Sequence, residues 1–344
     1  MIKAGIVGAT GYAGAELVRL LYAHPQAEIA AISSVSFEGQ ALSDVYPSYK
    51  FLNDMICKTQ GEVIEKSDVI FAALPHGLSQ ELAEKCIVAG KAFIDLGADF
   101  RLESEEEYTE WYGGTFLDKE LHKHSVYGLP EFFREQIKGK RLIANPGCYT
   151  TCSPLAIAPA IANGLISTKG IICDCKSGVT GAGRKPNQGS HFPELNEGFH
   201  AYKVASHRHT PEIEQTLSKL SGEDVTITFV PHLLPVNRGI LATVYADIKD
   251  GVSFENIKKA YEDYYKDEFF IRLLDDGKCA DIHNVRYSNF CDISLHHDKR
   301  AKKLVACAAI DNMVKGAAGQ AIQNMNIIFG LDEKTGLVIM PPAF

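Results

Sequence analysis

The sequence lacks the features of a nucleic-acid-binding protein or a membrane protein. Basic residues are not in excess: 35 Lys and Arg stand against 43 Asp and Glu, which gives a net charge of −8 at pH 7. A surface that follows a phosphate backbone needs the opposite balance, so we expect no nucleic-acid partner. Long apolar runs are also missing, because stretches such as DVIFAAL and LAIAPAIA fall far short of the ~20 residues that cross a bilayer. We therefore expect no membrane partner either.

The nine cysteines lack the pattern of a disulfide framework. Their number is odd, their spacing is irregular and no CxxC pair occurs, which is typical of reduced thiols in the cytoplasm. The chain begins with MIKAGIVGATG, which enters a strand without the charged, apolar and small-residue segments of a signal peptide. No spacing of His, Asp and Glu suggests metal ligands. We expect a cytoplasmic protein with no metal site.

Strands and helices alternate in the N-terminal part of the chain. Short apolar runs are separated by stretches with helical periodicity. This alternation predicts an α/β fold with a Rossmann-type parallel sheet that is covered on both faces. Residues 103–141 are more polar and aromatic, and we expect helices and loops there. The predicted strands lie at residues 2–8, 27–34, 67–75, 91–98 and 140–148.

The rest of the chain is rich in β-type runs with few helices between them. This composition predicts a second, α+β domain with a mixed or antiparallel sheet and helices on one face. A chain of 344 residues is long enough for two domains of ordinary size. We predict a nucleotide-binding Rossmann domain at 1–147, a catalytic domain at 148–310, and a C-terminal helix and tail at 311–344 that pack back on the first domain.

Gly8, Gly11 and Gly14 lie between the first predicted strand and the first predicted helix. In a dinucleotide-binding loop the first glycine permits a tight turn, the second lets the backbone approach a pyrophosphate, and the third allows close helix–strand packing. The helix N-terminus then offers N–H groups to the phosphates. A bare structural turn is the alternative, but the strand–loop–helix position favours a dinucleotide site. Thr10, Tyr12 and Ala13 of the same loop are assigned to this site as well.

The end of the second predicted strand indicates which dinucleotide binds. NAD-specific sites usually keep a carboxylate there, which accepts hydrogen bonds from the ribose hydroxyls. This strand ends in Ser33 and Ser34 instead. A carboxylate would repel the 2′-phosphate of NADP, whereas hydroxyls can donate to it, so the sequence favours NADP. The alternative is that both serines are ordinary turn residues.

Cys148 follows Asn-Pro-Gly, where a predicted strand gives way to a predicted helix. A thiol at the positive end of a helix dipole has its pKa lowered from ~8.5 into the range of roughly 3.5–7.5. Free N–H groups at the same place can hold an oxyanion. We therefore predict that Cys148 is a nucleophile rather than a buried apolar residue, and that prolines kink or delay the helix behind it. Cys152 is interpreted as a packing residue, or alternatively as a partner that protects the thiol from oxidation.

The segment HRHTPEI supplies two histidines for proton transfer. His207 and His209 are two residues apart, so in an extended segment both rings face the same side. Thr210 is expected to cap a helix, and Glu212 could orient one ring by a hydrogen bond. We favour His209 as the general acid–base and His207 as a substrate contact, and the order stays open. The alternative is that both are surface or capping histidines.

The segment KSGVTGAGRKPNQG is glycine-rich, basic and rich in hydroxyl groups. Its backbone N–H groups and its guanidinium could cradle a phosphate, and a flexible surface loop is the alternative. Arg101, at the end of a strand in the first domain, is a candidate for binding a phosphate or carboxylate, or else a surface arginine. The candidate residues of the loop are Ser177, Thr180, Gly181 and Arg184.

Nine segments in order along the chain carry a family resemblance: GIVGATGYAGAELVRLL, ALPHG, DLGADFRL, YGLPE, NPGCYTT, SGVTGAGR, HRHTPEI, NRGILATVY and DNMVKGAAGQAIQ. Through them the chain resembles the N-acetyl-gamma-glutamyl-phosphate reductases, which are related to aspartate-semialdehyde dehydrogenase. The resemblance implies an NADPH-dependent enzyme of arginine biosynthesis, a small anionic acyl phosphate as substrate, and a homo-oligomer, either dimer or tetramer.

The same resemblance implies further site residues. It points to the HRHTPEI segment as the source of the catalytic histidine. Thr150 stands where the family often has a small apolar residue or Pro, and Cys152 replaces a usual small residue, and both departures bear on fine specificity only. Asn312 corresponds to an amide on the nicotinamide side, although a helix cap would look the same. The other implied residues are Leu74, Pro75, His76 and Gly178 for the cofactor and Asn145 for the substrate.

These observations combine into one hypothesis. Cys148 attacks the acyl phosphate of an N-acetylated glutamate and expels phosphate, the thioester is reduced with a hydride from NADPH, and His209 protonates the hemithioacetal oxygen as the semialdehyde departs. Residue spacing does not identify N-acetylglutamate, which rests on the resemblance. Three alternatives stay open: a sister reductase for aspartyl or N-acetyl-aminoadipyl phosphate, a Cys–His hydrolase or acyltransferase, and a non-catalytic NADP sensor.

Overall fold

A computed structural model describes residues 1–52 and 54–344 of the chain. These residues divide into two compact units. The first unit contains residues 1–147 and 317–339, and the second contains residues 148–316 and 340–344. Across the described helices, none is both long and apolar enough to cross a membrane.

The first unit is built on a seven-stranded sheet in which every pair of neighbouring strands is parallel. The strand Ile2–Val7, third in the sheet, continues into the glycine loop, as expected for a Rossmann-type fold. The predicted parallel sheet is therefore confirmed. The strands in sheet order are β3 (Cys57–Lys58), β2 (Ala27–Ser33), β1 (Ile2–Val7), β4 (Val69–Ala72), β5 (Ala92–Asp95), β7 (Leu142–Ala144) and β6 (Val126–Tyr127).

Helices cover both faces of this sheet: all residues of β4 and of β5 are buried, although successive side chains of a strand point to opposite faces. On β1, Ile6 and Val7 point to opposite faces and each is at most 1% exposed. The helices are α1 (Tyr12–Tyr22), α2 (Leu42–Val45), α3 (Gln60–Lys66), α4 (Gln80–Val88), α5 (Glu105–Tyr112), α6 (Lys119–Lys123), α7 (Pro130–Ile137) and α12 (Gly319–Ile328), with short 3₁₀ turns at Val35–Phe37 and Pro47–Leu52.

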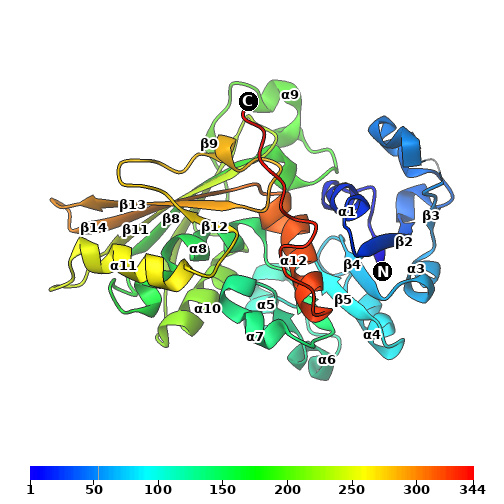
Figure 1. Cartoon of the computed structure of the whole chain (residues 1–344), viewed down its shortest axis with the longest axis horizontal. Helices are drawn as coiled ribbons and strands as arrows, with labels where there is room; N and C mark the ends of the chain where they lie inside the picture. The colour runs from blue at the N-terminus through cyan, green and yellow to red at the C-terminus, as the bar shows by residue number, and fades with distance from the viewer. Residues whose placement is uncertain (53) are drawn as a thin grey trace. The chain divides into compact units, whose positions relative to one another are not determined.

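The second unit contains a seven-stranded mixed sheet, as predicted. Two of its strand pairs are parallel and the others are antiparallel. Figure 1 follows this sheet from green to orange along the chain. In sheet order the strands are β12 (Ile271–Leu273), β13 (Cys291–Asp298), β14 (Lys303–Ile310), β11 (Ile240–Asp247), β8 (Ile171–Gly178), β10 (Ile227–Leu234) and β9 (His200–Ala201).

Three helices of the second unit, α8 (Cys148–Ala162), α10 (Thr210–Ser221) and α11 (Phe254–Tyr265), pack together on one face of the mixed sheet. On β11, alternate residues are fully buried while the residues between them are only half-buried, so the opposite face is covered far less. The remaining helical pieces are α9 (Phe192–Leu195), 3₁₀ turns at Val179–Ala182, Gln188–Ser190 and Ile282–Asn284, and a π-helical turn at Val314–Ala318.

Helix α8 is the centre of this unit, because its residues from Tyr149 to Ile161 are all buried. Such a helix is apolar on every side, as its sequence indicates. The expected delay by prolines does not occur: α8 begins at Cys148 and contains both Pro154 and Pro159. Pro159 cannot donate to the carbonyl four residues earlier. The hydroxyl of Tyr265 donates to that oxygen of Leu155 at 2.7 Å, so the missing hydrogen bond is replaced.

Candidate active site

The glycine loop has the conformation that each predicted role requires. Gly8 has a φ of +87°, which other residues rarely adopt, and its N–H donates to the Ser33 carbonyl at 3.0 Å. A side chain at Gly14 would lie 2.7 Å from Ala9 Cα, so the close packing there needs glycine. At Gly11 the nearest atom to an added Cβ is 3.4 Å away, so the protein's own packing leaves room on that side. The loop therefore offers open backbone at the N-terminus of α1.

The two serines at the end of β2 lie beside this loop. The hydroxyls of Ser34 and Thr10 are 2.6 Å apart and share a buried hydrogen bond. Ser33 is also buried, and its Oγ has no hydrogen-bond partner among the described residues. Tyr12, the first residue of α1, is exposed. The predicted contact of the serines with a 2′-phosphate stays a prediction.

Two buried aspartates, Asp95 and Asp99, accept hydrogen bonds from the loop after β4. They were not identified from the sequence. The Asp99 carboxylate accepts hydrogen bonds from the N–H groups of Gly77, at 2.5 Å, and Ser79, at 2.8 Å. Asp95 accepts from the Ser79 hydroxyl at 2.6 Å. Burial, together with the neighbouring Asp99, raises the pKa of Asp95 to about 6. The backbone that follows Leu74, Pro75 and His76 is thereby fixed.

Arg101 and Asn145 are both buried in the first unit, so the surface-arginine alternative is wrong. The Arg101 guanidinium donates to the carbonyls of Asn145 and Leu96, each at 2.8 Å. The Asn145 amide donates to the Ala317 carbonyl at 3.2 Å and accepts from Asn324 of α12 at 3.1 Å. These contacts fix the end of β7, and the predicted binding of substrate by both residues stays a prediction.

Cys148 is the first residue of α8 and is half-buried, which confirms the predicted helix start. Cys152, one turn later, is fully buried, and its thiol donates to the Ala308 carbonyl at 3.4 Å. Burial raises the pKa of Cys152 well above its usual value. These observations favour the packing interpretation of Cys152.

The two histidines of the HRHTPEI segment meet, but not for the reason predicted. The rings of His207 and His209 have centroids 4.7 Å apart. The backbone there turns instead of extending, and His209 has φ −81° and ψ −10° at the N-cap of α10, which begins at Thr210. The His209 N–H donates to His207 Nδ1 at 3.1 Å, which leaves the proton of the neutral ring on Nε2. Burial lowers the pKa of His207 to about 4.

Aromatic residues that sequence reasoning missed surround these rings. Tyr149, directly after Cys148, packs edge-on against His207 at 5.7 Å and against His209 at 5.9 Å between ring centroids. Its hydroxyl lies 3.1 Å from that of Tyr202. The ring of Phe229 also packs edge-on against His207, with 5.3 Å between the ring centroids. The position of Tyr149 beside the predicted nucleophile was the available signal.

Glu212 accepts a hydrogen bond that was not predicted. Its carboxylate is fully buried and accepts a hydrogen bond from the Thr150 hydroxyl at 2.6 Å. This bond joins the first turn of α10 to the first turn of α8. Thr150, the local departure from the family pattern, therefore has a structural role. The predicted orientation of a histidine by Glu212 stays a prediction.

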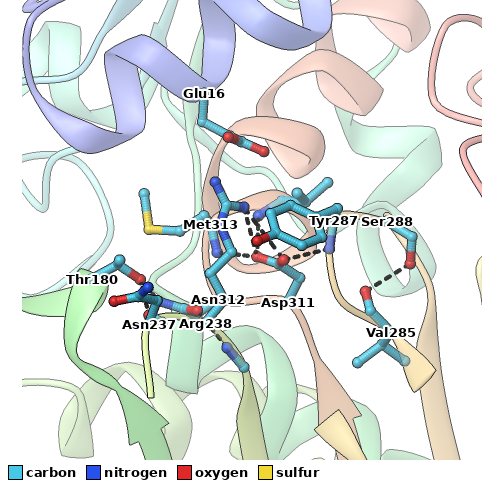
Figure 2. Close-up of polar contacts among 12 residues, drawn as sticks. Glu16, Thr180, Asn237, Arg238, Val285, Tyr287, Ser288, Asp311, Asn312 and Met313 are labelled. Atoms are coloured by element: carbon cyan, nitrogen blue, oxygen red, sulfur yellow. Dashed lines mark hydrogen bonds and ion pairs between the residues drawn. The ribbon is translucent and has the colours of Figure 1, made fainter. Parts of the chain in front are cut away.

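Asn312 fixes the backbone of the predicted phosphate loop. Its amide donates to the Thr180 hydroxyl at 3.0 Å and accepts from the Gly239 N–H at 2.8 Å, and the Thr180 hydroxyl itself donates to the Asn237 carbonyl at 2.5 Å (Figure 2). A side chain at Gly178 would lie 2.7 Å from the same Asn237 oxygen. The nearby Ser177 is buried, whereas Gly181 and Arg184 are exposed.

The helix-cap alternative belongs to Asp311 instead of Asn312. The Asp311 carboxylate accepts from the N–H groups of Met313, at 2.8 Å, and Val314, at 3.1 Å, where the π-helical turn begins. It also accepts from the Tyr287 N–H at 2.6 Å and pairs with Arg238 at 3.3 Å (Figure 2). The buried Asp311 carboxylate, through its hydrogen bonds with several donors, thus fixes the position of the end of β14.

The comparisons with known proteins agree with this architecture. Residues 3–140 match the family described as semialdehyde dehydrogenase, NAD binding domain, and residues 148–312 match semialdehyde dehydrogenase, dimerisation domain. The N-acetyl-gamma-glutamyl-phosphate reductase of Clostridium botulinum (strain Eklund 17B / Type B) is 56% identical over 344 residues, with all of both chains covered. That of Brachyspira hyodysenteriae is 51% identical over 352 residues, again with full coverage. The chain belongs to the N-acetyl-gamma-glutamyl-phosphate reductase family.

Solved structures confirm the fold of this family member. Aspartate semialdehyde dehydrogenase II of Vibrio cholerae, complexed with ASA, superposes with a TM-score of 0.73 at 16% identity, covering 95% of this chain and 98% of its own. The Candida albicans enzyme with NADP gives a TM-score of 0.71 at 17% identity, covering 95% and 98%. The resemblance found in the sequence is therefore confirmed, together with a dinucleotide-binding domain.

Proposed function

We propose that the protein reduces N-acetyl-gamma-glutamyl phosphate to N-acetylglutamate 5-semialdehyde and phosphate, with NADPH, in arginine biosynthesis. One observation carries the proposal. Cys148 is the first residue of α8, and the residue after it, Tyr149, packs against the rings of His207 and His209. The full-length identity to reductases of that name supports the substrate.

Cys148 is the proposed nucleophile. The N-terminus of α8 stabilises a thiolate, which attacks the acyl phosphate carbon, and the bond to phosphate breaks. Backbone N–H groups of the first turn hold the oxyanion of the tetrahedral intermediate. The departing phosphate is bound by the loop residues Ser177, Thr180, Gly181 and Arg184. We assign Arg101 and Asn145 to substrate binding.

His209 is the proposed acid–base group. It donates a proton to the carbonyl oxygen as the thioester is reduced, and it takes that proton back as the hemithioacetal breaks down to the semialdehyde and the Cys148 thiolate. His207 stays neutral near pH 7 because its pKa is about 4, so it contacts the substrate through an uncharged ring. Glu212 supports this segment from the first turn of α10. This division of roles follows from the burial of His207.

The glycine loop fits a dinucleotide, because the positive φ at position 8 favours glycine and the backbone at Gly11 has room for a phosphate to approach. Gly8, Gly11 and Gly14 with Thr10, Tyr12 and Ala13 would hold the pyrophosphate, and Ser33 and Ser34 the 2′-phosphate of NADP. Bound NADPH supplies a hydride. The remaining proposed cofactor residues are Leu74, Pro75, His76, Gly178 and Asn312.

The proposal is tested by following oxidation of NADPH with N-acetyl-gamma-glutamyl phosphate, for the wild type and for Cys148→Ser. We expect turnover by the wild type and a loss of at least ~10³-fold in the variant, since a hydroxyl is a far weaker nucleophile at neutral pH. Aspartyl phosphate is the control donor. Near-full activity of the variant would exclude the thioester, and turnover of aspartyl phosphate alone would point to the sister reductase.

We further propose a cytoplasmic homo-oligomer, a dimer or tetramer, formed through the half-buried face of the second unit's sheet. The match to a dimerisation domain over residues 148–312 supports an oligomer. On that face the central strands present Leu241, Tyr245 and Ile172, and Ile172 is 38% exposed. The nine free thiols are consistent with a reducing compartment.

A further inference from the structure

The π-helical turn Val314–Ala318 passes directly over Cys148. Within it, the Gly316 N–H donates to the Asp311 carbonyl, five residues earlier, at 3.0 Å. A Cβ added to Gly316 would lie 2.8 Å from Cys148 Cβ and 3.1 Å from Cys148 Cα. Single π turns of this kind are rare and often lie at functional sites. The predicted nucleophile is therefore in contact with backbone that carries no side chain.

The glycine is required by the contact and not by its backbone conformation. Gly316 is outside the positive-φ glycines of the chain, so an alanine could adopt its φ without strain. Alanine is also the better helix former, by roughly 1 kcal/mol. The space that Cys148 occupies opposes both preferences. An alanine Cβ at position 316 would lie less than 3.0 Å from Cys148 Cβ, so one of the two residues would have to shift.

Neither side of the contact can move easily. The atoms met are the Cα and Cβ of Cys148, which follow the position of α8 itself. That helix is buried from its second residue, and Thr150 ties it to Glu212. On the other side, the turn is anchored at Asp311, whose carboxylate accepts from the N–H groups of Met313 and Val314 at the start of the turn and pairs with Arg238.

We propose that Gly316 is a positioning residue for the nucleophile: the bare π turn fixes where the first residue of α8 lies and so aims the Cys148 thiol. The inference rests on the proposed function, in which Cys148 forms the thioester. A side chain at position 316 displaces the start of α8, and with it the thiol and the N–H groups that hold the oxyanion. A misplacement of about 1 Å costs on the order of 10²-fold in rate.

The test compares Gly316→Ala with the wild type in three measurements. We expect kcat to fall by roughly 10- to 100-fold, while the KM for NADPH changes much less than kcat, since most of the proposed cofactor residues, the glycine loop among them, belong to the other unit. The pH midpoint of thiol alkylation at Cys148 should shift, because the thiol leaves its place at the helix N-terminus. Gly61→Ala in α3 is the matched control, because its added Cβ meets only Thr59 Oγ1 at 4.0 Å.

A double-mutant cycle separates the contact from general damage. Gly316→Ala should lower the Tm by about 3–8 °C in the wild type, and by clearly less in a Cys148→Gly background, where the opposing Cβ is absent. An equal loss of Tm in both backgrounds, or unchanged kcat and alkylation in Gly316→Ala, overturns the proposal. If the wild type fails to reduce the acyl phosphate, the proposed function is wrong, and the alkylation profile and the cycle still decide the role of Gly316.

Discussion

At the scale of single residues, the sequence was most informative where one residue type is required by geometry. Gly8 has the positive φ that its place after a strand predicts, and Gly14 has no room for a side chain. Cys148 begins a helix, as Asn-Pro-Gly before it indicates. In contrast, the buried pair of Asp95 and Asp99 was missed, because nothing in the order of residues says that two carboxylates meet beneath a loop.

His207 carries a residue-scale prediction about pH. Burial lowers its pKa from 6.5 to about 4, so the folded ring is neutral throughout the range from about pH 5 to 8. We expect His207→Gln to lower kcat/KM without changing the shape of its pH profile in that range. His209→Gln should lower kcat by ~10²–10⁴-fold. Steady-state rates measured across pH check both, and loss of a pH step in His207→Gln would contradict the assignment.

The same pKa affects stability. Between about pH 6.5 and 4 the unfolded ring binds a proton that the folded ring does not, so His207 lowers the free energy of unfolding as the pH falls through this window. The full effect is about 3 kcal/mol. Urea unfolding at pH 7 and pH 4.5 should therefore show a smaller acid loss in His207→Gln than in the wild type.

At the scale of elements, the strands and helices were predictable from local patterns, but their ties were not. β8, β10, β11 and β14 lie in the part of the chain whose β-type runs predicted a second sheet, and buried residues alternate with less buried ones within each of these strands. The bond from Thr150 to Glu212 joins residues 62 positions apart, and that from Asn312 to Thr180 joins residues 132 apart. The π turn before α12 was not predicted either. The Asp311 carboxylate accepts hydrogen bonds from the N–H groups of Met313 and Val314 where this turn begins, and the sequence does not show these bonds.

The tie between α8 and α10 carries a prediction of its own. Thr150→Val keeps the shape of the side chain but removes one donor from the buried Glu212 carboxylate. We expect the free energy of unfolding to fall by about 1–3 kcal/mol. Thr150→Ser should recover most of it, and Thr216→Val, whose hydroxyl donates only to the Glu212 backbone carbonyl at 2.9 Å, serves as the control. Denaturant titrations measure the three variants, and equal losses in Thr150→Val and Thr216→Val would show that the tie is unimportant.

At the scale of the whole molecule, the chain enters the second unit at Cys148 and leaves it after Gly316. The two residues in contact at the nucleophile are therefore also the first and last residues of the unit's main segment. Sequence reasoning could identify Cys148 from its local motif. It could not identify Gly316, because the reason for that glycine lies 168 positions away along the chain.

Assembly of whole molecules gives the last prediction. Tyr245 lies in β11, the central strand of the mixed sheet, and pairs with Val305 on one side and Ile172 on the other. A charge placed in the apolar centre of an interface opposes association. We therefore expect Tyr245→Lys to convert an oligomeric wild type to monomers at micromolar concentration, measured by light scattering during size-exclusion chromatography. Tyr22→Lys, on the exposed side of α1, should leave the mass unchanged. An oligomer that persists in Tyr245→Lys would mean that the copies meet through another surface.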